Sequence, residues 1–344
     1  MTDLAVEEVG ESSAPEWDTF VRTQLGWTPY HLYAWRRILE GVYGHRSFYI
    51  GARAPDGALA GVLPLVRVRS PLFGHFLISM PFLNYGGPLG GDGAVVALAE
   101  RAVEIARGER ADLLELRSAR ELPLALPVSH RKITVTLDLP AGDAVALWDD
   151  LSSKVRSQVR RPMKEGVEVR FGPGELDGFY AVFAQHMRDL GTPVQSKLFF
   201  EQARDQFRDA MWFGCAYLSG RPVAAGSGFR WAKRFELVWA SALFEYNRIA
   251  PNMLLYWRFL EQCAQDGVEV FDFGRCTEGS GTHRFKQQWG GRDEPLWWYQ
   301  AGVKAGGGTP SPDSGPYSLG PRVWSRLPLA LANALGPRIV RYLP

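Results

Sequence analysis

The sequence predicts an α/β protein in which one arrangement of helices and strands occurs twice. Its 344 residues are 46% hydrophobic, 12% aromatic and 22% charged, which supplies apolar side chains for two buried cores of ordinary size. Runs that alternate like strands are interleaved with runs whose apolar residues recur at helical spacing. Both halves follow the same coarse order without a residue-level repeat. A cleft between two such halves is the expected ligand site.

The first half comprises residues 1–145. After a helix at residues 30–42, strand-like runs separated by Pro- and Gly-containing turns are followed by a helical run and by two further strands. In order, the expected strands lie at residues 47–54, 58–68 and 75–82, the helix at 94–111, and the last strands at 113–119 and 132–140.

The second half comprises residues 146–304 and repeats this order. A helical segment at residues 143–165 spans the boundary between the halves. After it we expect a strand at 167–172, a helix at 175–191, two hairpin strands at 212–231 and 234–243, a helix at 252–266 and a strand at 268–274. Residues 305–321 are rich in Gly, Pro and Ser and predict a linker to a C-terminal helix at 322–344.

Charge and cysteine content exclude several classes of protein. The 39 basic residues are nearly balanced by 37 acidic ones, so any nucleic-acid surface must be a local patch. Cys215, Cys263 and Cys276 lie far apart and form no C-x-x-C pair, which indicates neither a disulfide framework nor a zinc site. We expect buried, reduced thiols and no metal.

The chain ends bear on localisation. Residues 1–13 are acidic and lack the basic and apolar regions of a signal peptide, and no apolar run is long enough to span a bilayer, so we expect a cytoplasmic protein. Residues 324–344 combine Leu, Ile and Val with arginines, a composition that suits the inner face of the cytoplasmic membrane. Packing against the body of the enzyme is the alternative for this tail.

The stretch with the strongest chemical signal is FDFGRCTEGSGTHRFKQQWGG, residues 271–291. A short apolar strand containing Asp272 runs into a polar loop, after which Lys286 appears. Ligands in α/β proteins bind beyond the carboxyl ends of strands. Lys286 there would counter a phosphate or stabilise the oxyanion formed at an acyl carbonyl, and a solvated surface lysine is the alternative.

This stretch resembles the C-terminal motif of the FemABX aminoacyltransferases, in which an aromatic-Asp-Phe-Gly strand end precedes a Phe-Lys pair and an aromatic-Gly pair. KVRSQVRRPMKEGVEVR resembles the basic helix that opens the family's second domain, and GFYAVFAQHMRDLGTP resembles a helix that carries an arginine. The segments HMRDLGTP, WASALFEYN, NMLLYW and FKQQWG are most similar to the subfamily associated with exosortase and PEP-CTERM systems.

The resemblance implies a tandem of two GNAT-type domains with a C-terminal helical tail. It also implies transfer of an aminoacyl group from aminoacyl-tRNA, a donor substrate, to an amine of a peptidoglycan precursor, without a cofactor. An amine attacks an ester carbonyl, and the enzyme positions both reactants and stabilises the oxyanion.

The resemblance assigns roles to individual residues. Lys286 matches the family lysine at the reacting end of the substrates, and Arg188 matches the arginine that binds the precursor's diphosphate. In YHLYAWRRI, Arg36 or Arg37 matches a basic residue that reaches phosphate, although Tyr30-His31 replaces the family's Gln-Ser. Arg275 replaces the second glycine after Asp-Phe, which places a side chain against the substrate.

Further candidates follow from the residue types. Asp272 and Glu236 lie in strand-like apolar contexts that suit a general base, and a structural role is the alternative for both. The basic helix suits the phosphates of tRNA, with a solvated helix face as the alternative. Its candidate contacts are Lys154, Arg156, Arg160 and Arg161. Aromatic residues that suit stacking on a base or sugar, or else belong to the core, are Tyr85, Trp239, Tyr246 and Tyr256.

The acyl donor remains open between two chemistries. Enzymes that use acyl-CoA bind its pyrophosphate with glycine-rich amides at a helix N-terminus. Here Ala250, Pro251 and Asn252 stand at the corresponding turn, and Pro251 has no amide hydrogen to donate. The alternatives are therefore a CoA-dependent N-acyltransferase that acts on an amino sugar of an exopolysaccharide, and a scaffold that binds an envelope precursor without catalysis.

Overall fold

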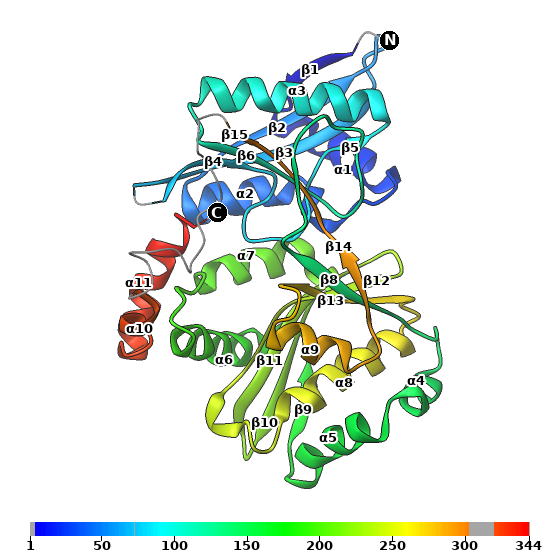
Figure 1. Ribbon diagram of the computed structural model, residues 1–344, viewed down its shortest axis with the longest axis vertical. Helices are drawn as coiled ribbons and strands as arrows, with labels where there is room; N and C mark the ends of the chain where they lie inside the picture. The colour runs from blue at the N-terminus through cyan, green and yellow to red at the C-terminus, as the bar shows by residue number, and fades with distance from the viewer. Residues whose placement is uncertain (1–3, 72, 303–319, 344) are drawn as a thin grey trace. The chain divides into compact units, whose positions relative to one another are not determined.

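The computed structural model describes residues 4–71, 73–302 and 320–343, and it divides into two compact units (Figure 1). Unit 1 contains the chain through Lys132, the segment that begins at Pro295, and the residues from Arg341. Unit 2 contains Ile133–Glu294 and the segment that ends at Val340. The expected linker at 305–321 lies almost entirely outside the described residues.

Unit 1 is built on a mixed sheet in which β4 and β6 are parallel neighbours and the other pairs are antiparallel. The strand order is β1 (Ala5–Glu8), β2 (Arg46–Arg53), β3 (Leu59–Ser70), β4 (Gly74–Ile78), β6 (Leu113–Ser118), β15 (Trp297–Gly302) and β7 (Val128–Ser129), and β5 (Leu89–Gly90) pairs with β3.

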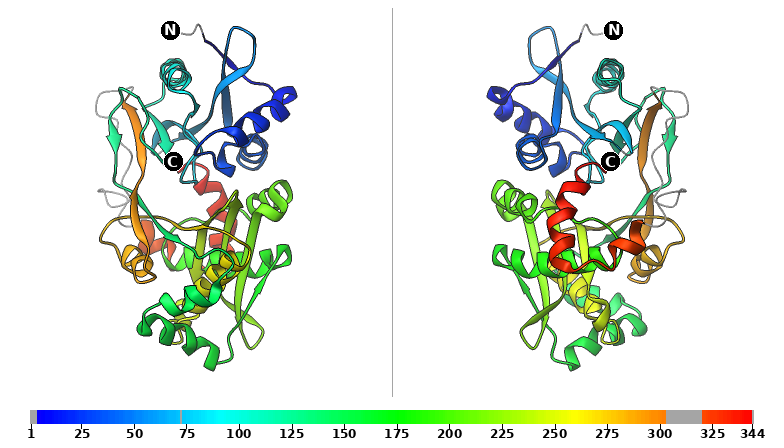
Figure 2. Two further views of the ribbon diagram at one scale, coloured as in Figure 1. Left: turned by 90° about the vertical axis from the view of Figure 1, so that its right-hand side faces the viewer. Right: turned by 90° about the vertical axis from the view of Figure 1, so that its left-hand side faces the viewer.

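Helices cover both faces of this sheet. Figure 2 shows α3 (Asp92–Gly108) on one face, and α1 (Ala14–Thr23) and α2 (Ala34–Tyr43) on the other. Small residues bring α3 close to the sheet, because a Cβ added at Gly61 would lie 2.8 Å from the Cβ of Ala94. The unit also has 3₁₀ turns at η1 (Glu11–Ser13) and η2 (Pro29–His31).

Unit 2 has a second mixed sheet with the same kind of central pair, in which β12 and β13 are parallel. Its strand order is β14 (Arg292–Pro295), β8 (Ile133–Asp138), β13 (Val270–Cys276), β12 (Arg234–Ala242), β11 (Arg221–Trp231), β10 (Met211–Leu218) and β9 (Glu168–Phe171). The helices are α4 (Ala144–Asp150), α5 (Ser153–Lys164), α6 (Leu176–Asp189), α7 (Lys197–Phe207), α8 (Pro251–Gln265), α9 (Gly281–Gln287), α10 (Gly320–Trp324) and α11 (Leu329–Val340), with 3₁₀ turns η3 (Pro173–Glu175), η4 (Arg208–Ala210) and η5 (Phe244–Tyr246).

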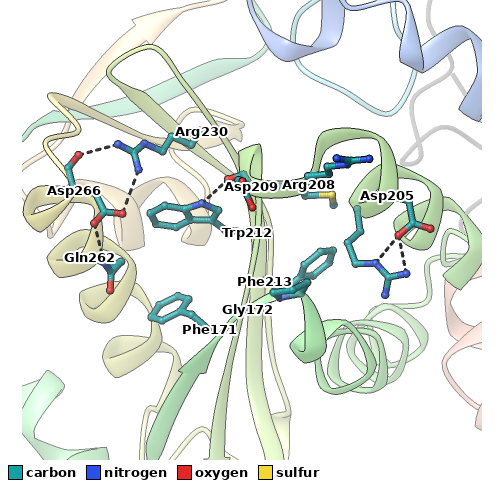
Figure 3. A pocket seen from close by; sticks show the side chains of 13 residues that line it. Phe171, Gly172, Asp205, Arg208, Asp209, Trp212, Phe213, Arg230, Gln262 and Asp266 are labelled. Carbon is teal, nitrogen blue, oxygen red and sulfur yellow. Dashed lines mark hydrogen bonds and ion pairs between the residues drawn. The ribbon is translucent and has the colours of Figure 1, made fainter.

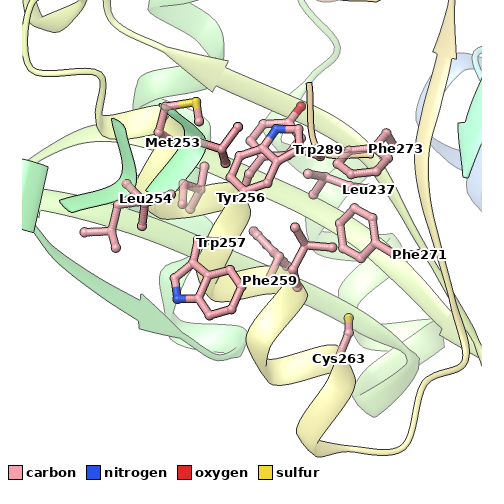
Figure 4. Close-up of a cluster of buried hydrophobic side chains, with 14 of the residues drawn as sticks. Leu237, Met253, Leu254, Tyr256, Trp257, Phe259, Cys263, Phe271, Phe273 and Trp289 are labelled. Carbon is pink, nitrogen blue, oxygen red and sulfur yellow. The ribbon is translucent and has the colours of Figure 1, made fainter. Parts of the chain in front are cut away.

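The main core of unit 2 lies between α8 and one face of the sheet (Figure 4). Alternate residues of a strand point to opposite faces, and Gly214 and Gly226 point toward Phe259 of α8, since a Cβ on either glycine would lie within about 3.1 Å of that ring. Phe271 and Phe273 of β13 join the same core, 4.8 Å apart between ring centroids. Asp272, between them in the chain, therefore faces the other side of the sheet.

The structure differs from the sequence expectations at several boundaries. The division between units falls at residues 132/133, because β8 pairs with β13 and so belongs to unit 2. The helical segment at 143–165 is two helices separated at Leu151 and Ser152, and Ser152 caps α5 by accepting from the Val155 amide. The expected C-terminal helix at 322–344 is also two helices, α10 and α11.

The described residues contain no helix long and apolar enough to cross a membrane. The three cysteines are buried and form no disulfide within the described part of the chain.

Candidate functional site

The candidate site lies where the parallel pair β12–β13 ends. The register runs from Arg234–Val270 to Glu236–Asp272. Beyond that point β13 pairs with β8, while β12 continues along β11 to Ala242. Both acids at the last register position, Glu236 and Asp272, are fully buried, at 0% exposure. Two carboxyl groups are thus placed side by side where the two strands part.

Asp272 is held by its own strand and by β8. Its Oδ1 accepts a hydrogen bond from the Thr134 hydroxyl and another, 2.8 Å long, from the Gly274 amide. Gly274 has φ +74°, a left-handed conformation that favours glycine. The first glycine of the motif, Gly274, is thus kept where the backbone needs it. Arg275 replaces only the second glycine.

Lys286 reaches this point from α9. The helix begins at Ser280, whose side chain accepts from the His283 amide 3.1 Å away. His283 is itself fixed, because its Nδ1 accepts from the Gly279 amide at 2.9 Å and its Nε2 lies 2.9 Å from both carboxylate oxygens of Asp293. His283 therefore ties the first turn of α9 both to the preceding loop, at Gly279, and to Asp293.

The Lys286 side chain is buried, with 3% exposure. Its Nζ donates to the carbonyl oxygens of Gly274 (2.5 Å) and Arg275 (2.9 Å). The solvated-lysine alternative is thus excluded by the structure, and the ammonium lies against the strand end that follows Asp272.

Burial lowers the pKa of Lys286, and the nearby acidic groups of Cys276, Asp272 and Glu236 oppose that change. The opposing influence of Asp272 and Glu236 shows that the three residues proposed from the sequence as catalytic lie in one electrostatic cluster. An ammonium group has three donors. Among the described residues two carbonyl oxygens take two of them, and the third is suited to an oxyanion.

The turn that precedes α8 lies just past the end of β12. Ala250 has φ +54°, and Pro251 is the first residue of the helix. The amide of Met253 donates back to the Ala250 carbonyl at 3.0 Å. The turn is therefore closed by its own backbone, with an alanine in a strained conformation and a proline in place of an amide donor.

The arginines assigned to phosphate binding are engaged with protein groups. Arg188, at the end of α6, pairs with Asp189 at 2.7 Å and donates to the Leu327 carbonyl at 3.0 Å. In unit 1, Arg36 pairs with Glu8 (3.1 Å) and Glu40 (3.2 Å). Arg37 pairs with Glu11 at the surface of the same unit. Arg188 thus contacts the end of its own helix and the C-terminal tail.

The aromatic candidates are mostly core residues. Trp239 packs edge-on against Phe200, 5.1 Å between centroids, and Tyr256 packs edge-on against Phe285 at 4.8 Å. In unit 1, Tyr85 is buried and stacked on Tyr30. Tyr246, on η5, is half-buried and accepts from Arg221 at 3.1 Å.

The basic candidates lie along α5. Lys154, Arg160 and Arg161 are exposed. Arg156 is half-buried and donates to the Asp149 carbonyl at 2.9 Å, and the Arg160 guanidinium lies 5.2 Å from the centre of the Trp148 ring. Three of the four cations therefore face solvent.

Sequence reasoning missed two residues of the site. Thr134, which binds Asp272, lies 138 positions away in the chain and carries no local signal. His283 had a signal, because Ser280 three residues before it in GSGTHRF has the spacing of a helix N-cap and its capped amide.

Comparisons with known proteins identify the kind of domain that carries this cluster. Residues 153–287 match the family of GNAT acetyltransferase domains. A UDP-N-acetylmuramoylpentapeptide-lysine N(6)-alanyltransferase of Weissella viridescens is 22% identical over 147 residues, which are 42% of this chain and 44% of that protein. The match thus spans less than half of the relative's length.

Solved structures share the fold across most of the chain. The crystal structure of FemX has a TM-score of 0.64 at 14% identity and covers 87% of this chain and 98% of its own. A tandem GNAT protein from the clavulanic acid pathway has a TM-score of 0.55 at 13% identity, with coverages of 88% and 99%. The L-PGS structure from Bacillus licheniformis also scores 0.55 at 13% identity, with coverages of 87% and 94%.

These likenesses confirm the tandem GNAT fold expected from the sequence. The strand pair β12–β13, the helix α8 and Lys286 all fall within the segment that matches the GNAT family. Residues 153–287 thus form a GNAT-type domain, and the fold of the chain is similar to that of FemX and of a tandem GNAT protein.

Proposed function

We propose that this protein is an acyltransferase that moves an aminoacyl group onto an amine of a cell-envelope precursor, with Lys286 stabilising the oxyanion. The observation that carries the proposal is the buried ammonium at the end of the parallel pair in a GNAT domain. Preorganised donors in a water-excluded site are worth far more than the same donors in water.

In the proposed step the amine nitrogen attacks the ester carbonyl carbon, and a C–N bond forms while the carbonyl oxygen becomes an oxyanion. The third donor of Lys286 receives that charge. The intermediate then collapses, the C–O bond to the donor breaks and the alcohol leaves. The nitrogen loses one proton in the process, and the leaving oxygen gains one, so no further reactant is needed.

Two carboxyl groups near Lys286 are suited to take up that proton. Asp272 already accepts two hydrogen bonds through Oδ1 and so also holds the strand end in shape. Glu236 lies beside it on β12. We assign Glu236 the role of proton acceptor and Asp272 a positioning role in addition.

Support for an ester donor such as aminoacyl-tRNA comes from two places. The turn before α8 has no glycine and begins its helix with Pro251, so it lacks the bare amides that suit a CoA pyrophosphate. Exposed Lys154, Arg160 and Arg161 on α5 offer phosphate contacts. The named relative, an alanyltransferase acting on a lysine of a UDP-linked muropeptide, suggests the acceptor class.

The competing proposal is a CoA-dependent N-acyltransferase that acts on an amino sugar of an exopolysaccharide. The observation in its favour is the match to a family described as acetyltransferases. A scaffold that binds an envelope precursor without catalysis would keep the fold but would leave the buried lysine without a reaction to serve.

The C-terminal helices bear on localisation. Gly336 of α11 packs closely on Val194, where an added Cβ would lie 3.0 Å from the Val194 nitrogen, and Gly191 packs against Pro321 in the same way. These contacts favour packing of the tail on unit 2. Membrane contact through exposed Val323 and Leu331 is the alternative, within a proposed cytoplasmic location.

The test is a side-by-side transfer assay with purified protein. One arm supplies alanyl-tRNA with a UDP-linked muropeptide, and the other supplies acetyl-CoA with a UDP-amino sugar. We expect product only in the first arm, and only with Lys286 intact. Product in the second arm alone would contradict an ester donor and support the CoA-dependent N-acyltransferase. No product in either arm, together with tight muropeptide binding, would support a scaffold without catalysis.

A further inference from the structure

A pocket of about 870 Å³ lies in unit 2 and shares none of its lining residues with the Lys286 cluster. It is formed by the ends of β9, β10 and β11, by the turn η4 and by the last turns of α8 (Figure 3). The Lys286 cluster uses β12, β13 and α9 instead. The volume falls within the roughly 300–1,000 Å³ that ligand pockets occupy.

The apolar part of the pocket is a set of three rings. Figure 3 shows Trp212 in the middle, with Arg230 above it and Phe171 and Phe213 below. The indole N–H of Trp212 donates to the Asp209 carbonyl at 3.1 Å, which fixes the orientation of the ring. Trp212 is only half-buried, so part of this large ring borders the pocket.

The polar rim consists of planar side chains that are already ordered. Arg230 pairs with the Asp266 carboxylate at 3.2 Å and donates to its carbonyl at 2.8 Å. Gln262 donates to the same carboxylate at 3.0 Å. Across the pocket Arg204 donates to Asp205 at 2.9 Å. These contacts hold a guanidinium, an amide and carboxylates in fixed positions around the rings.

Arg208 completes the rim in an unusual backbone conformation, with φ +43° and ψ −119° just after α7. Such a conformation is costly for a residue with a side chain, and costs of this kind cluster at functional sites. The lining therefore includes three arginines and three aspartates, which are Arg204, Arg208, Arg230, Asp205, Asp209 and Asp266. Its formal charge is balanced.

We propose that this pocket binds a neutral saccharide. Aromatic rings pack against the C–H face of a pyranose by apolar contact, while planar guanidinium, carboxylate and amide groups donate to and accept from its hydroxyls. A phosphate-bearing ligand fits less well, because two of the arginines are already neutralised by aspartates and the ligand would face three carboxylates. A cationic ligand also fits less well, because it would face three arginines.

The proposal does not depend on acyl transfer at Lys286. A saccharide bound here would attach the protein to a glycan through unit 2, at a surface separate from the reacting groups. The failure of one idea would therefore leave the other standing, because a Lys286→Met variant is expected to bind saccharide as the wild type does.

The test is saturation-transfer difference NMR on the full chain, with cellobiose, maltotriose and di-N-acetylchitobiose as neutral probes and glucose 6-phosphate as an anionic comparator. We expect saturation transfer to the ring C–H protons of at least one neutral probe. Trp212→Leu should weaken its binding by about tenfold, which combines lost ring contact with lost area. Asp266→Asn, which keeps the shape of the rim, should weaken it by several-fold.

Trp148→Leu is the matched control, because Trp148 is also half-buried, also lies beneath an arginine and also packs against another ring. It should leave binding unchanged. The proposal is overturned if no neutral probe shows saturation transfer, if glucose 6-phosphate binds at least as tightly as its neutral counterparts, or if folded Asp266→Asn and Trp212→Leu proteins bind like the wild type.

Discussion

In unit 1 the parallel pair β4–β6 ends at Ile78–Glu115, and in unit 2 the parallel pair β12–β13 ends at Glu236–Asp272. Each pair is registered over three positions, and in each the second strand carries a buried acid at the last of them. The two units therefore place a carboxylate at the same topological point. What surrounds that carboxylate differs.

In unit 1, residues of β6 and of the loop after β4 surround the Glu115 carboxylate at the end of the parallel pair. Arg117 pairs with Glu115 at 2.8 Å and donates to the Leu83 carbonyl at 3.0 Å, while the Arg117 amide donates to the Ser79 hydroxyl at 2.7 Å. The Gly87 amide in turn donates to the Arg117 carbonyl at 2.7 Å. Arg117 thereby bonds the loop after β4 to the sheet, and the buried charges of Arg117 and Glu115 neutralise each other.

Unit 2 brings a lysine from a separate helix to the equivalent point. Lys286 donates to two backbone carbonyl oxygens and lies in the field of two acids. A closed ion pair stabilises a fold, whereas an ammonium with a remaining donor is suited to a reaction. The comparison teaches that the same strand pair is closed by an ion pair in unit 1, whereas in unit 2 it carries the lysine to which we assign the proposed reaction.

The largest expected effect tests the closed pair of unit 1. Arg117→Met leaves the Glu115 carboxylate buried without its guanidinium, so the free energy of unfolding should fall by about 3–5 kcal/mol. Urea unfolding followed by circular dichroism measures it. Arg101→Met, which breaks the exposed Arg101–Glu104 pair, should cost less than about 1 kcal/mol. Equal costs for the two variants would contradict the structural role of Arg117.

The next effect concerns acid. His31 fastens the unit 1 loop through a 3.0 Å contact with the Gly87 carbonyl, and burial lowers its pKa to about 4. The unfolded chain then binds the proton more tightly, so stability is present above about pH 6.5 and is lost as pH falls toward 4, by roughly 3 kcal/mol for a fully buried group.

Urea unfolding at pH 7 and pH 4.5 measures that loss. Burial also lowers the pKa of His45 to about 4, so His31→Gln should reduce the loss without abolishing it. A His31→Gln protein that loses as much stability as the wild type would rule out His31 as the source.

A smaller loss of stability is expected in unit 2, where Thr134 binds Asp272. Thr134→Val removes the hydroxyl that binds buried Asp272 and should cost about 1–3 kcal/mol of unfolding free energy, because the carboxylate loses a donor. Thr136→Val is the control, since Thr136 is equally buried but binds Glu294, which is 35% exposed and can turn to water. Thermal and urea unfolding should rank Thr134→Val as the more damaging change.

The smallest effect tests tRNA contact by unit 2. If Lys154, Arg160 and Arg161 contact phosphates, replacing each by Gln should reduce the slope of log affinity against log salt by roughly 0.7–0.9 per contact. Filter binding of tRNA across a salt series measures the slope, with Arg101→Gln in unit 1 as the control. An unchanged slope in the triple variant would identify the exposed face of α5 as merely solvated.

Much of the fold follows from local patterns. Strand alternation located β2, β3, β6 and β12, and helical spacing located α3 and α8. The single strand expected at 212–231 is two strands, β10 and β11, because the chain turns between Leu218 and Arg221. No sequence pattern predicted α1, which buries only Ala14, Trp17 and Val21. Short amphipathic helices of this kind depend on tertiary packing more than on their own pattern.

The domain boundary could not be read from the sequence for a physical reason. β8 lies between the halves in the chain, and its place in unit 2 depends on pairing with β13, more than 130 positions later. β15 likewise pairs with β6 of unit 1 after the chain has passed through unit 2. Pairing over such separations leaves no local trace.

Part of the candidate site could be predicted from the sequence. The motif around Lys286 pointed to the lysine and to Asp272, and the strand pattern pointed to Glu236. Burial of the lysine by Gly274 and Arg275 depends on the angle at which α9 leaves its loop, which Ser280 and His283 set. The engagement of Arg188 by the Leu327 carbonyl depends on how the tail packs, and no pattern near residue 188 indicates it.

The central claim is that the Lys286 ammonium serves acyl transfer, and a pH–rate profile of the wild type and of Lys286→Met tests it most directly. With the donor and acceptor that turn over, Lys286→Met should lose about 100- to 1,000-fold in kcat while keeping a cooperative thermal transition. Because burial lowers the pKa of Lys286, wild-type activity should fall at alkaline pH before the usual lysine range near 10.5 is reached. A folded Lys286→Met protein within tenfold of wild-type kcat, with the same alkaline limb, would contradict the account.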